Sequence, residues 1–299
     1  MHQIKSVLLL LGIFAVFSII SFSLFGWVGA LAVLGIGLAV QGFAQQRGAG
    51  LILRFHRARE VDPQEAPILH RIAAELAARA SMPIPQLMVY PSEMPNAFAI
   101  GTGKTHGVVA VSSGLLSLLD RREVTGVLAH EFAHLKNRDS SLSALAGLVV
   151  QATTSVSHLF GFAVLLLLLS GAWGTAGVSL WSEIVLFALA PTGTALLLAA
   201  FMRTRERLAD EDAAKLTGDP RGLASALYKL QEFSKSLERY LRRFRFIHTV
   251  EQDRGAALLR SHPSTRERVE ALVNMDAKLV RHPAYRLPAY PQWRSVASF

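Results

Sequence analysis

Long apolar stretches alternate with charged ones along this chain of 299 residues. No Lys or Arg occurs in residues 6–46 or 142–202, and each of these regions contains two apolar runs. A helix needs about 20 apolar residues to cross a hydrocarbon core of about 30 Å. The pattern therefore predicts four transmembrane helices arranged as two hairpins. The runs cover residues 7–25, 27–44, 145–170 and 184–202.

The positive charges lie outside these apolar regions. All 31 Lys and Arg residues occur at Lys5, within 47–141 or after Met202. Against 22 Asp and Glu residues they leave a net charge of +9. A basic chain can bind nucleic acid, but basic residues confined to one side of a membrane follow the positive-inside rule. We therefore expect a lipid bilayer, and no nucleic acid, as a partner. Both termini and both charged segments are predicted to be cytoplasmic.

The same pattern divides the chain into four segments. Residues 1–46 and 142–202 are predicted to form the membrane hairpins, and 47–141 and 203–299 to combine into one cytoplasmic domain. A cleaved signal peptide is the alternative for the N-terminus. Its apolar part would be too long, however, and a second apolar run follows almost at once.

Three short strands are predicted between the hairpins. Residues 85–90, 97–100 and 107–112 are rich in strand-forming side chains, and Pro, Asn and Gly residues separate them. Strands of this length with turns between them indicate a small, largely antiparallel sheet.

Helices are predicted on both sides of these strands. Asp62 followed by Pro63 is a helix start signal. Asp120 and Glu123 form a capping box, which predicts another helix that runs to about Arg138. Helical patterns continue after the second hairpin. The predicted fold class is an α+β membrane protein, with four transmembrane helices and a mainly helical domain that contains a small β-sheet.

The helix after the capping box carries the sequence His130-Glu131-Phe132-Ala133-His134. Histidines four residues apart lie on one face of a helix, so both imidazoles can bind one metal ion. The chain has no Cys, which excludes thiolate ligands. Histidine and carboxylate ligands suit Zn²⁺, one ion per chain, with Glu131 facing a water in an open coordination position.

A third ligand is expected just after the fourth apolar run. Glu206 lies four residues beyond that run, and Asp210 follows one turn later on the same helix face. We predict that Glu206 completes the ligand set and that Asp210 accepts the second imidazole N–H of a liganding histidine. Glu211 is the competing candidate, but it faces about 140° away from Glu206.

These residues together indicate a hydrolytic site. Glu131 is expected to act as the general base, while the metal lowers the pKa of its water and polarises a carbonyl. A developing oxyanion also needs a donor besides the metal. The sequence offers several cations for this task without choosing between them, including Arg203, His262 and Arg268.

The sequence resembles the HtpX family of membrane-bound zinc metalloproteases, which are relatives of the CAAX prenyl proteases. The resemblance covers nearly the whole chain. Met202 stands where the family often has Ser, a departure that leaves the ligand set intact. The resemblance rests on His130–His134 with the following Leu135-Lys136-Asn137-Arg138-Asp139, on Arg203, Glu206 and Asp210, on Asn96-Ala97-Phe98-Ala99, and on His262-Pro263 with Arg268.

The resemblance implies a gluzincin-like catalytic domain on the cytoplasmic face of the bacterial inner membrane. It also implies proteolytic quality control under stress, with misfolded membrane proteins or unfolded polypeptides as substrates. By similarity to the prenyl proteases, His262 and Arg268 would contact the substrate or the oxyanion. The residues alone favour an ordinary turn at Asn96. The resemblance instead favours Asn96, Ala97 and Phe98 as a strand edge that binds an extended substrate.

Two other functions are consistent with the same motif. An intramembrane protease of the site-2 type would place the motif inside a transmembrane helix, but charged residues at Asp120–Glu123 and at Lys136 flank it here. A non-enzymatic membrane chaperone would hold a structural metal. Such a site normally fills its fourth position with a protein ligand, and no fourth His or Cys occurs at a suitable spacing.

Overall fold

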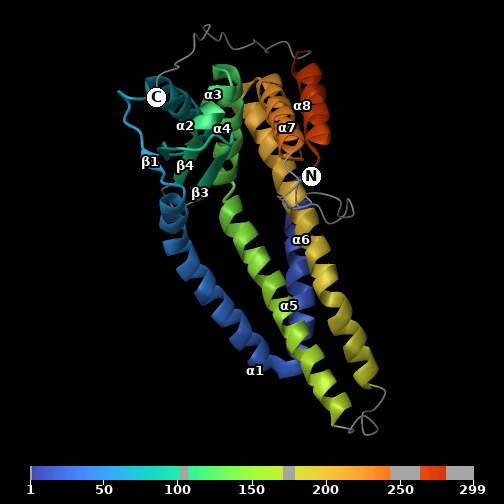
Figure 1. Cartoon of the computed structure of the whole chain (residues 1–299). Helices are drawn as coiled ribbons and strands as arrows, with labels where there is room; N and C mark the ends of the chain where they lie inside the picture. Colours follow the sequence, from blue (N-terminus) through green and yellow to red (C-terminus); the bar gives the residue numbers. More distant parts are fainter. Residues whose placement is uncertain (1, 102–106, 171–178, 243–262, 281–299) are drawn as a thin grey trace. The chain divides into compact units, whose positions relative to one another are not determined.

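The computed structural model describes residues 2–101, 107–170, 179–242 and 263–280 (Figure 1). These residues form two compact units. The first unit contains residues 2–44 and 141–205. The second contains the described residues of 45–140, 206–254 and 263–299.

Three long helices contribute to the first unit: α1 (His2–Phe55), α5 (Asp139–Leu169) and α6 (Ser179–Thr217). The chain changes direction within α1 at Gly26, whose φ of 60° and ψ of −164° are accessible essentially only to glycine. By length and composition, three described stretches are suited to crossing a membrane. They are His2–Ser23, Asp139–Leu169 and Trp181–Thr217.

The first, third and fourth predicted spans lie within these stretches. The second predicted span, residues 27–44, belongs to the latter part of α1, where most side chains lie outside the described part of the structure. The chain is therefore a multi-pass membrane protein with three candidate spans among the described residues, and the fourth span stays a prediction.

Apolar side chains from all three helices pack together inside the first unit. One cluster contains Ile13, Phe17, Val149 and Phe201. A second cluster is built around Phe187, which stacks on Phe160 with ring centroids 4.2 Å apart. In a lipid environment such packing, and not water exclusion, holds helices together.

One four-stranded sheet lies in the second unit. Its strands are β1 (Arg59–Glu60), β2 (Gln86–Tyr90), β3 (Ala97–Gly101) and β4 (Gly107–Ser112), in the order β1-β2-β4-β3. The predicted strands match β2, β3 and β4 to within one residue. The β1/β2 and β3/β4 pairs are antiparallel.

The expectation of a largely antiparallel sheet needs correction, because β2 and β4 are parallel. The chain passes from β2 to the far edge of the sheet, forms β3 there, and returns through β4 in the middle. The returning strand β4 therefore runs in the same direction as β2. This order leaves β3 as an edge strand.

Helix α2 (Pro67–Ala80) begins later than the Asp62-Pro63 signal predicted. Residues 62–66 instead form a turn, in which the Gln64 N–H donates to Oδ1 of Asp62 at 2.8 Å. A helix starting at Pro63 would place Pro67 in its interior, where the missing N–H and the ring are costly. Pro67 is tolerated at the first position of the helix, so the helix starts there.

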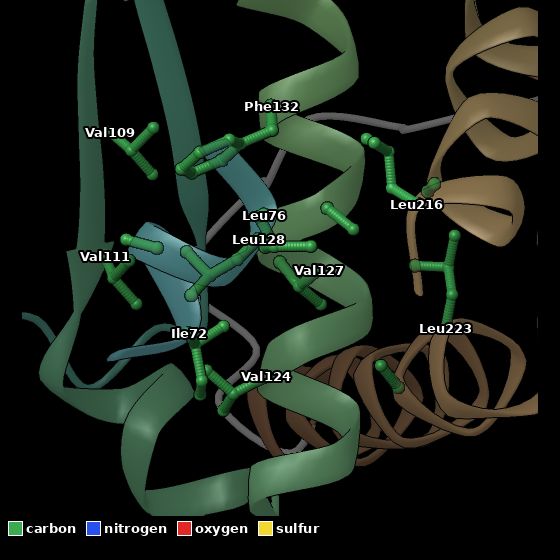
Figure 2. Close-up of a cluster of buried hydrophobic side chains, with 14 of the residues drawn as sticks. Ile72, Leu76, Val109, Val111, Val124, Val127, Leu128, Phe132, Leu216 and Leu223 are labelled. Atoms are coloured by element: carbon green, nitrogen blue, oxygen red, sulfur yellow. The ribbon is translucent and has the colours of Figure 1, made fainter. Parts of the chain in front are cut away.

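Helix α4 (Arg121–Lys136) lies at the centre of the second unit. Phe132 and Leu128 point from α4 toward Val109 and Val111 of β4 (Figure 2). Leu216 and Leu223 lie on the other side of α4. The remaining helices of the unit are α3 (Ser113–Leu118), α7 (Pro220–Arg242) and α8 (Thr265–Val280). Burial on both sides fixes the helix that carries the motif.

Gly126 allows α4 and α7 to pack at close range. A Cβ atom added there would lie 2.6 Å from the backbone nitrogen of Leu223 and 2.8 Å from its Cα. Backbone atoms cannot move aside as a flexible side chain can. The close approach of these two helices therefore requires glycine at this position.

We expect Gly126→Ala to lower the free energy of unfolding by about 1–3 kcal/mol, because overpacking outweighs the better helix propensity of Ala. Thermal unfolding of the purified protein in detergent measures the change. Gly161→Ala is the matched control, since a Cβ atom there meets nothing within 4 Å. Equal unfolding midpoints for the two variants would contradict the packing argument.

Candidate metal centre

The start of α4 is fixed by a buried carboxylate. Asp120 Oδ1 accepts the Glu123 N–H, and Glu123 Oε2 accepts the Asp120 N–H, both at 2.9 Å. Glu123 also accepts hydrogen bonds from Ser225 Oγ at 2.6 Å and Lys229 Nζ at 2.7 Å. The predicted capping box is therefore present, and it also attaches α4 to α7 two turns before the motif.

The two motif histidines face each other on α4. Their Nε2 atoms are 3.1 Å apart. Glu206 of α6 lies opposite, with one carboxylate oxygen 3.6 Å from His130 Nε2 and the other 3.6 Å from His134 Nε2. These three residues form a cluster in which one ligand atom of each lies within 4.8 Å of the others.

The spacing of these atoms fits a metal ion. Bonds of about 2.0–2.1 Å in tetrahedral geometry put neighbouring ligand atoms about 3.3–3.4 Å apart. The observed separations of 3.1 and 3.6 Å lie on both sides of that value. The spacing of His130, His134 and Glu206 is therefore compatible with one tetrahedral cation held by the three side chains.

A carboxylate lies against the Nδ1 atom of each histidine. Asp210 Oδ1 is 3.0 Å from His130 Nδ1, and Asp139 Oδ2 is 2.7 Å from His134 Nδ1. Such contacts orient the ring and keep the proton on Nδ1, so that Nε2 is free to bind a metal. The placement of Asp210 agrees with the role predicted for it from its spacing, and that role remains a proposal.

Sequence reasoning missed the corresponding role of Asp139. Its position after the motif depends on a turn between α4 and α5 in which Arg138 adopts a φ of 54°. The Asn137 side chain donates to Asp212 of α6 at 2.9 Å and fixes this turn from outside. The available signal was an acidic residue, Asp139, shortly after a motif histidine. Helical spacing alone, however, does not predict that the chain turns back and brings Asp139 against His134.

Arg268 of α8 joins the carboxylates of the site. It donates to both oxygens of Asp210, at 2.7 and 2.8 Å, and its Nη1 lies 3.3 Å from Glu206 Oε2. The guanidinium is largely buried, with 13% of the side chain exposed. Its interactions with Asp210 and Glu206 raise the pKa of Arg268 against the lowering effect of burial.

The electrostatics of the site favour a bound cation. Burial alone would lower the pKa of His130, but the carboxylates of Asp210 and Glu206 raise it to about 9. Burial would likewise raise the pKa of Asp210, and the contacts with His130 and Arg268 lower it instead. A potential that holds a proton on a buried imidazole also stabilises a metal ion at that place.

The other predicted site residues lie in different places. Glu131 is half-buried on α4, and its charge raises the pKa of Arg268. Asn96 precedes β3, while Ala97 and Phe98 begin that edge strand. Arg203 belongs to the first unit and His262 lies outside the described residues, so their roles stay predictions. The observed partners of Arg268 are the carboxylates of Asp210 and Glu206 and, at 3.5 Å, Nε2 of His130. Its contact with substrate also stays a prediction.

A helix with two histidines, a carboxylate opposite them and candidate membrane spans in one chain are the features of a membrane-bound metallopeptidase. The comparison with known families agrees with this class. The model of Peptidase family M48 matches residues 63–276, which is most of the chain. The chain belongs to peptidase family M48.

Relatives named Protease HtpX homolog extend this match over nearly the whole chain and confirm the resemblance. The chain is 40% identical over 277 residues to the Protease HtpX homolog of Kineococcus radiotolerans, and the match covers 90% of this chain and 92% of the relative. It is 33% identical over 275 residues to that of Desulfatibacillum aliphaticivorans, covering 91% and 89%.

Similarity to a solved structure supports the fold. The crystal structure of S. mikatae Ste24p matches with a TM-score of 0.53 and 23% sequence identity. The match covers 90% of this chain but 65% of Ste24p, so the chain spans less than two thirds of that protein's length.

We expect Asp139→Asn to weaken metal binding about 10–100-fold, because the amide cannot hold the His134 tautomer as the carboxylate does. Competition with a chelator, followed by measurement of bound metal, gives the affinity. Glu267→Gln is the control, since the contact of the Glu267 side chain with Arg207 is exposed and long, at 3.7 Å. Equal affinities for both variants would exclude a role for Asp139 in orienting the ligand.

Proposed function

We propose that this chain is a zinc metalloendopeptidase that cleaves membrane proteins, including misfolded ones, at the cytoplasmic membrane surface. The observation that carries this proposal is the arrangement of His130, His134 and Glu206 as three ligands with Glu131 on the same helix. Three protein ligands with one open position are typical of catalytic zinc sites.

Within this proposal, each side chain of the site has one task. His130, His134 and Glu206 hold one Zn²⁺, which when bound lowers the pKa of water and polarises a peptide carbonyl. Glu131 takes a proton from the attacking water and then delivers it to the leaving amine. Asp139 and Asp210 keep the imidazoles oriented.

The position of β3 at the edge of the sheet favours the interpretation that the chain is an endopeptidase and not another kind of hydrolase. An extended peptide can add to a free sheet edge through its main chain, which requires no particular side chains. Strand β3 packs beside α4, the helix that carries the motif. A peptide paired with Asn96–Ala99 would therefore run past the helix that carries Glu131.

The substrate class follows from the setting of the site. Glu206 lies on α6, and Asp139 is the first residue of α5, so both residues are on helices with candidate spans. A role in quality control is what the resemblance to the HtpX family implies, and the relatives named Protease HtpX homolog support that resemblance. The confinement of Lys and Arg to three polar segments supports a cytoplasmic site in the bacterial inner membrane.

The two alternatives have less support. Helix α4 is not among the three candidate spans of the described residues, which disfavours an intramembrane site. A structural metal would leave Glu131 without a task. In the part of the chain that the structure describes, the ligand cluster contains three residues and no fourth.

We expect Glu131→Gln to keep its zinc and to lose peptide cleavage by a factor of at least about 100, because general-base catalysis contributes about 10²–10⁴-fold. Metal analysis and cleavage of a casein-type substrate by the purified full chain measure the two properties. Glu267→Gln, which changes an exposed glutamate of α8, is the control. A fully active Glu131→Gln variant would end the peptidase proposal.

The proposed topology has its own test. A reporter fused at residue 176, between the third and fourth predicted spans, should report a location outside the cytoplasm. A fusion after residue 299 should report the cytoplasm, because the positive-inside rule places the basic segments there. A cytoplasmic signal at residue 176 would overturn the arrangement of four spans.

A further inference from the structure

The edge of β3 presents a defined set of backbone groups. At Asn96 the chain faces β4, because Ser112 N donates to Asn96 O at 2.9 Å and Asn96 N donates to Ser112 Oγ at 2.9 Å. Tyr90 adds a second donor to the same carbonyl at 3.3 Å. The backbone N–H and C=O groups of Asn96 are therefore both hydrogen-bonded within the sheet.

The backbone N–H and C=O groups of the next residues point alternately toward β4 and away from it. In an antiparallel pair, residues that exchange hydrogen bonds with the partner strand alternate with residues that do not. Ala97 lies opposite Val111 and Ala99 opposite Val109. Counting from Asn96, the N–H and C=O groups of Ala97 and Ala99 point away from β4. These groups are the ones that a peptide added to β3 would use.

One of these outward groups already has a donor from this chain. Ser140 Oγ donates to Ala99 O at 3.2 Å. Ser140 lies in the first turn of α5, which is 41 residues away in the sequence. Its hydroxyl thus takes the role that a peptide N–H would take at the same carbonyl.

The position of Ser140 is coupled to the metal centre. The preceding residue, Asp139, lies against His134, and the left-handed Arg138 sets the direction of both residues. Because Asp139 and Ser140 are adjacent, the segment that orients a metal ligand also contacts the edge strand. The contact therefore has a fixed place relative to His134.

We propose that Ser140 determines where a peptide substrate stops pairing with β3. The Ser140 hydroxyl donates to the Ala99 carbonyl. A substrate main chain can therefore pair with Ala97, but its N–H opposite Ala99 gains no hydrogen bond. This inference rests on the proposed peptidase function. Ser140 is thus a specificity-determining residue, which limits the length of the paired segment without contacting the reacting atoms.

A purely structural role for Ser140 makes a different prediction. If the hydroxyl only attached α5 to β3, its removal would change the cleavage of all peptides by the same factor. If it occupies a substrate position, its removal changes the response to one particular substrate N–H. N-methylation removes single N–H groups from a peptide, so it separates the two roles.

The test is an N-methyl scan of one cleaved peptide with the purified full chain loaded with zinc. The variants are Ser140→Ala, Ser140→Thr, which keeps a hydroxyl, and Ser117→Ala. Ser117 is a matched control, since its exposed hydroxyl donates to Ser113 O within its own helix. The measured quantity is kcat/KM for each N-methylated peptide relative to the unmodified one.

In wild type we expect N-methylation to be costly at the residue that pairs with Ala97, and without effect two residues away, opposite Ala99. Ser140→Ala should make that second position sensitive by about two- to tenfold, the size of one hydrogen bond. Ser140→Thr and Ser117→Ala should keep the wild-type pattern.

An unchanged N-methyl profile in Ser140→Ala, or a uniform change for every peptide, would overturn the proposal. Sensitivity opposite Ala99 already present in wild type would do so as well. The proposed function fails in a separate way. In that case the zinc-loaded wild type would not cleave the unmodified peptide at all.

Discussion

In the candidate metal centre, each motif histidine has a carboxylate beside its Nδ1 atom, and this contact constrains the geometry of the whole cluster. Asp210 and Asp139 occupy these positions, at 3.0 and 2.7 Å. With Nδ1 engaged in this way, the two Nε2 atoms face each other and Glu206. The arrangement gathers several negative charges in a small buried volume, which repel one another unless cations lie between them. Arg268 is one such cation, which explains why a charged side chain is largely buried there.

The membrane helices take part directly in this site. Helix α6 runs from Ser179 to Thr217, so one helix contains a candidate span, Glu206 and Asp210. Helix α5 begins with Asp139 and contains another candidate span. Only α4 and α8 contribute to the metal centre without a candidate span of their own. A third ligand on a continuous helix is positioned more accurately than one on a loop, because the helix fixes its backbone.

The sequence was sufficient for the parts of the site that follow local periodicity. Helical spacing places His130 near His134 and Glu206 near Asp210, and the capping box marks the start of α4. The parallel pairing of β2 with β4 could not be predicted this way, because strand order depends on contacts between distant segments. The late start of α2 shows two local signals in conflict. Both Pro63 and Pro67 are typical of a helix start, and the helix begins at Pro67 because a proline in its interior would be costly. Asp139 was missed because its position depends on a left-handed residue that no periodic pattern indicates.

That left-handed residue shows how strain near the site is compensated. Arg138 has a side chain, and a left-handed conformation costs such a residue about 1–2 kcal/mol relative to helix. Hydrogen bonds on both sides of it offset this cost: Asn137 donates to Asp212, and Asp139 lies against His134. Hydrogen bonds with charged partners contribute about 1.5–3 kcal/mol each. Either contact is large enough to offset the cost by itself, so α6 and His134 both stabilise the turn. The contact of Asp139 with His134 and the position of Ser140 beside β3 therefore depend on the same turn.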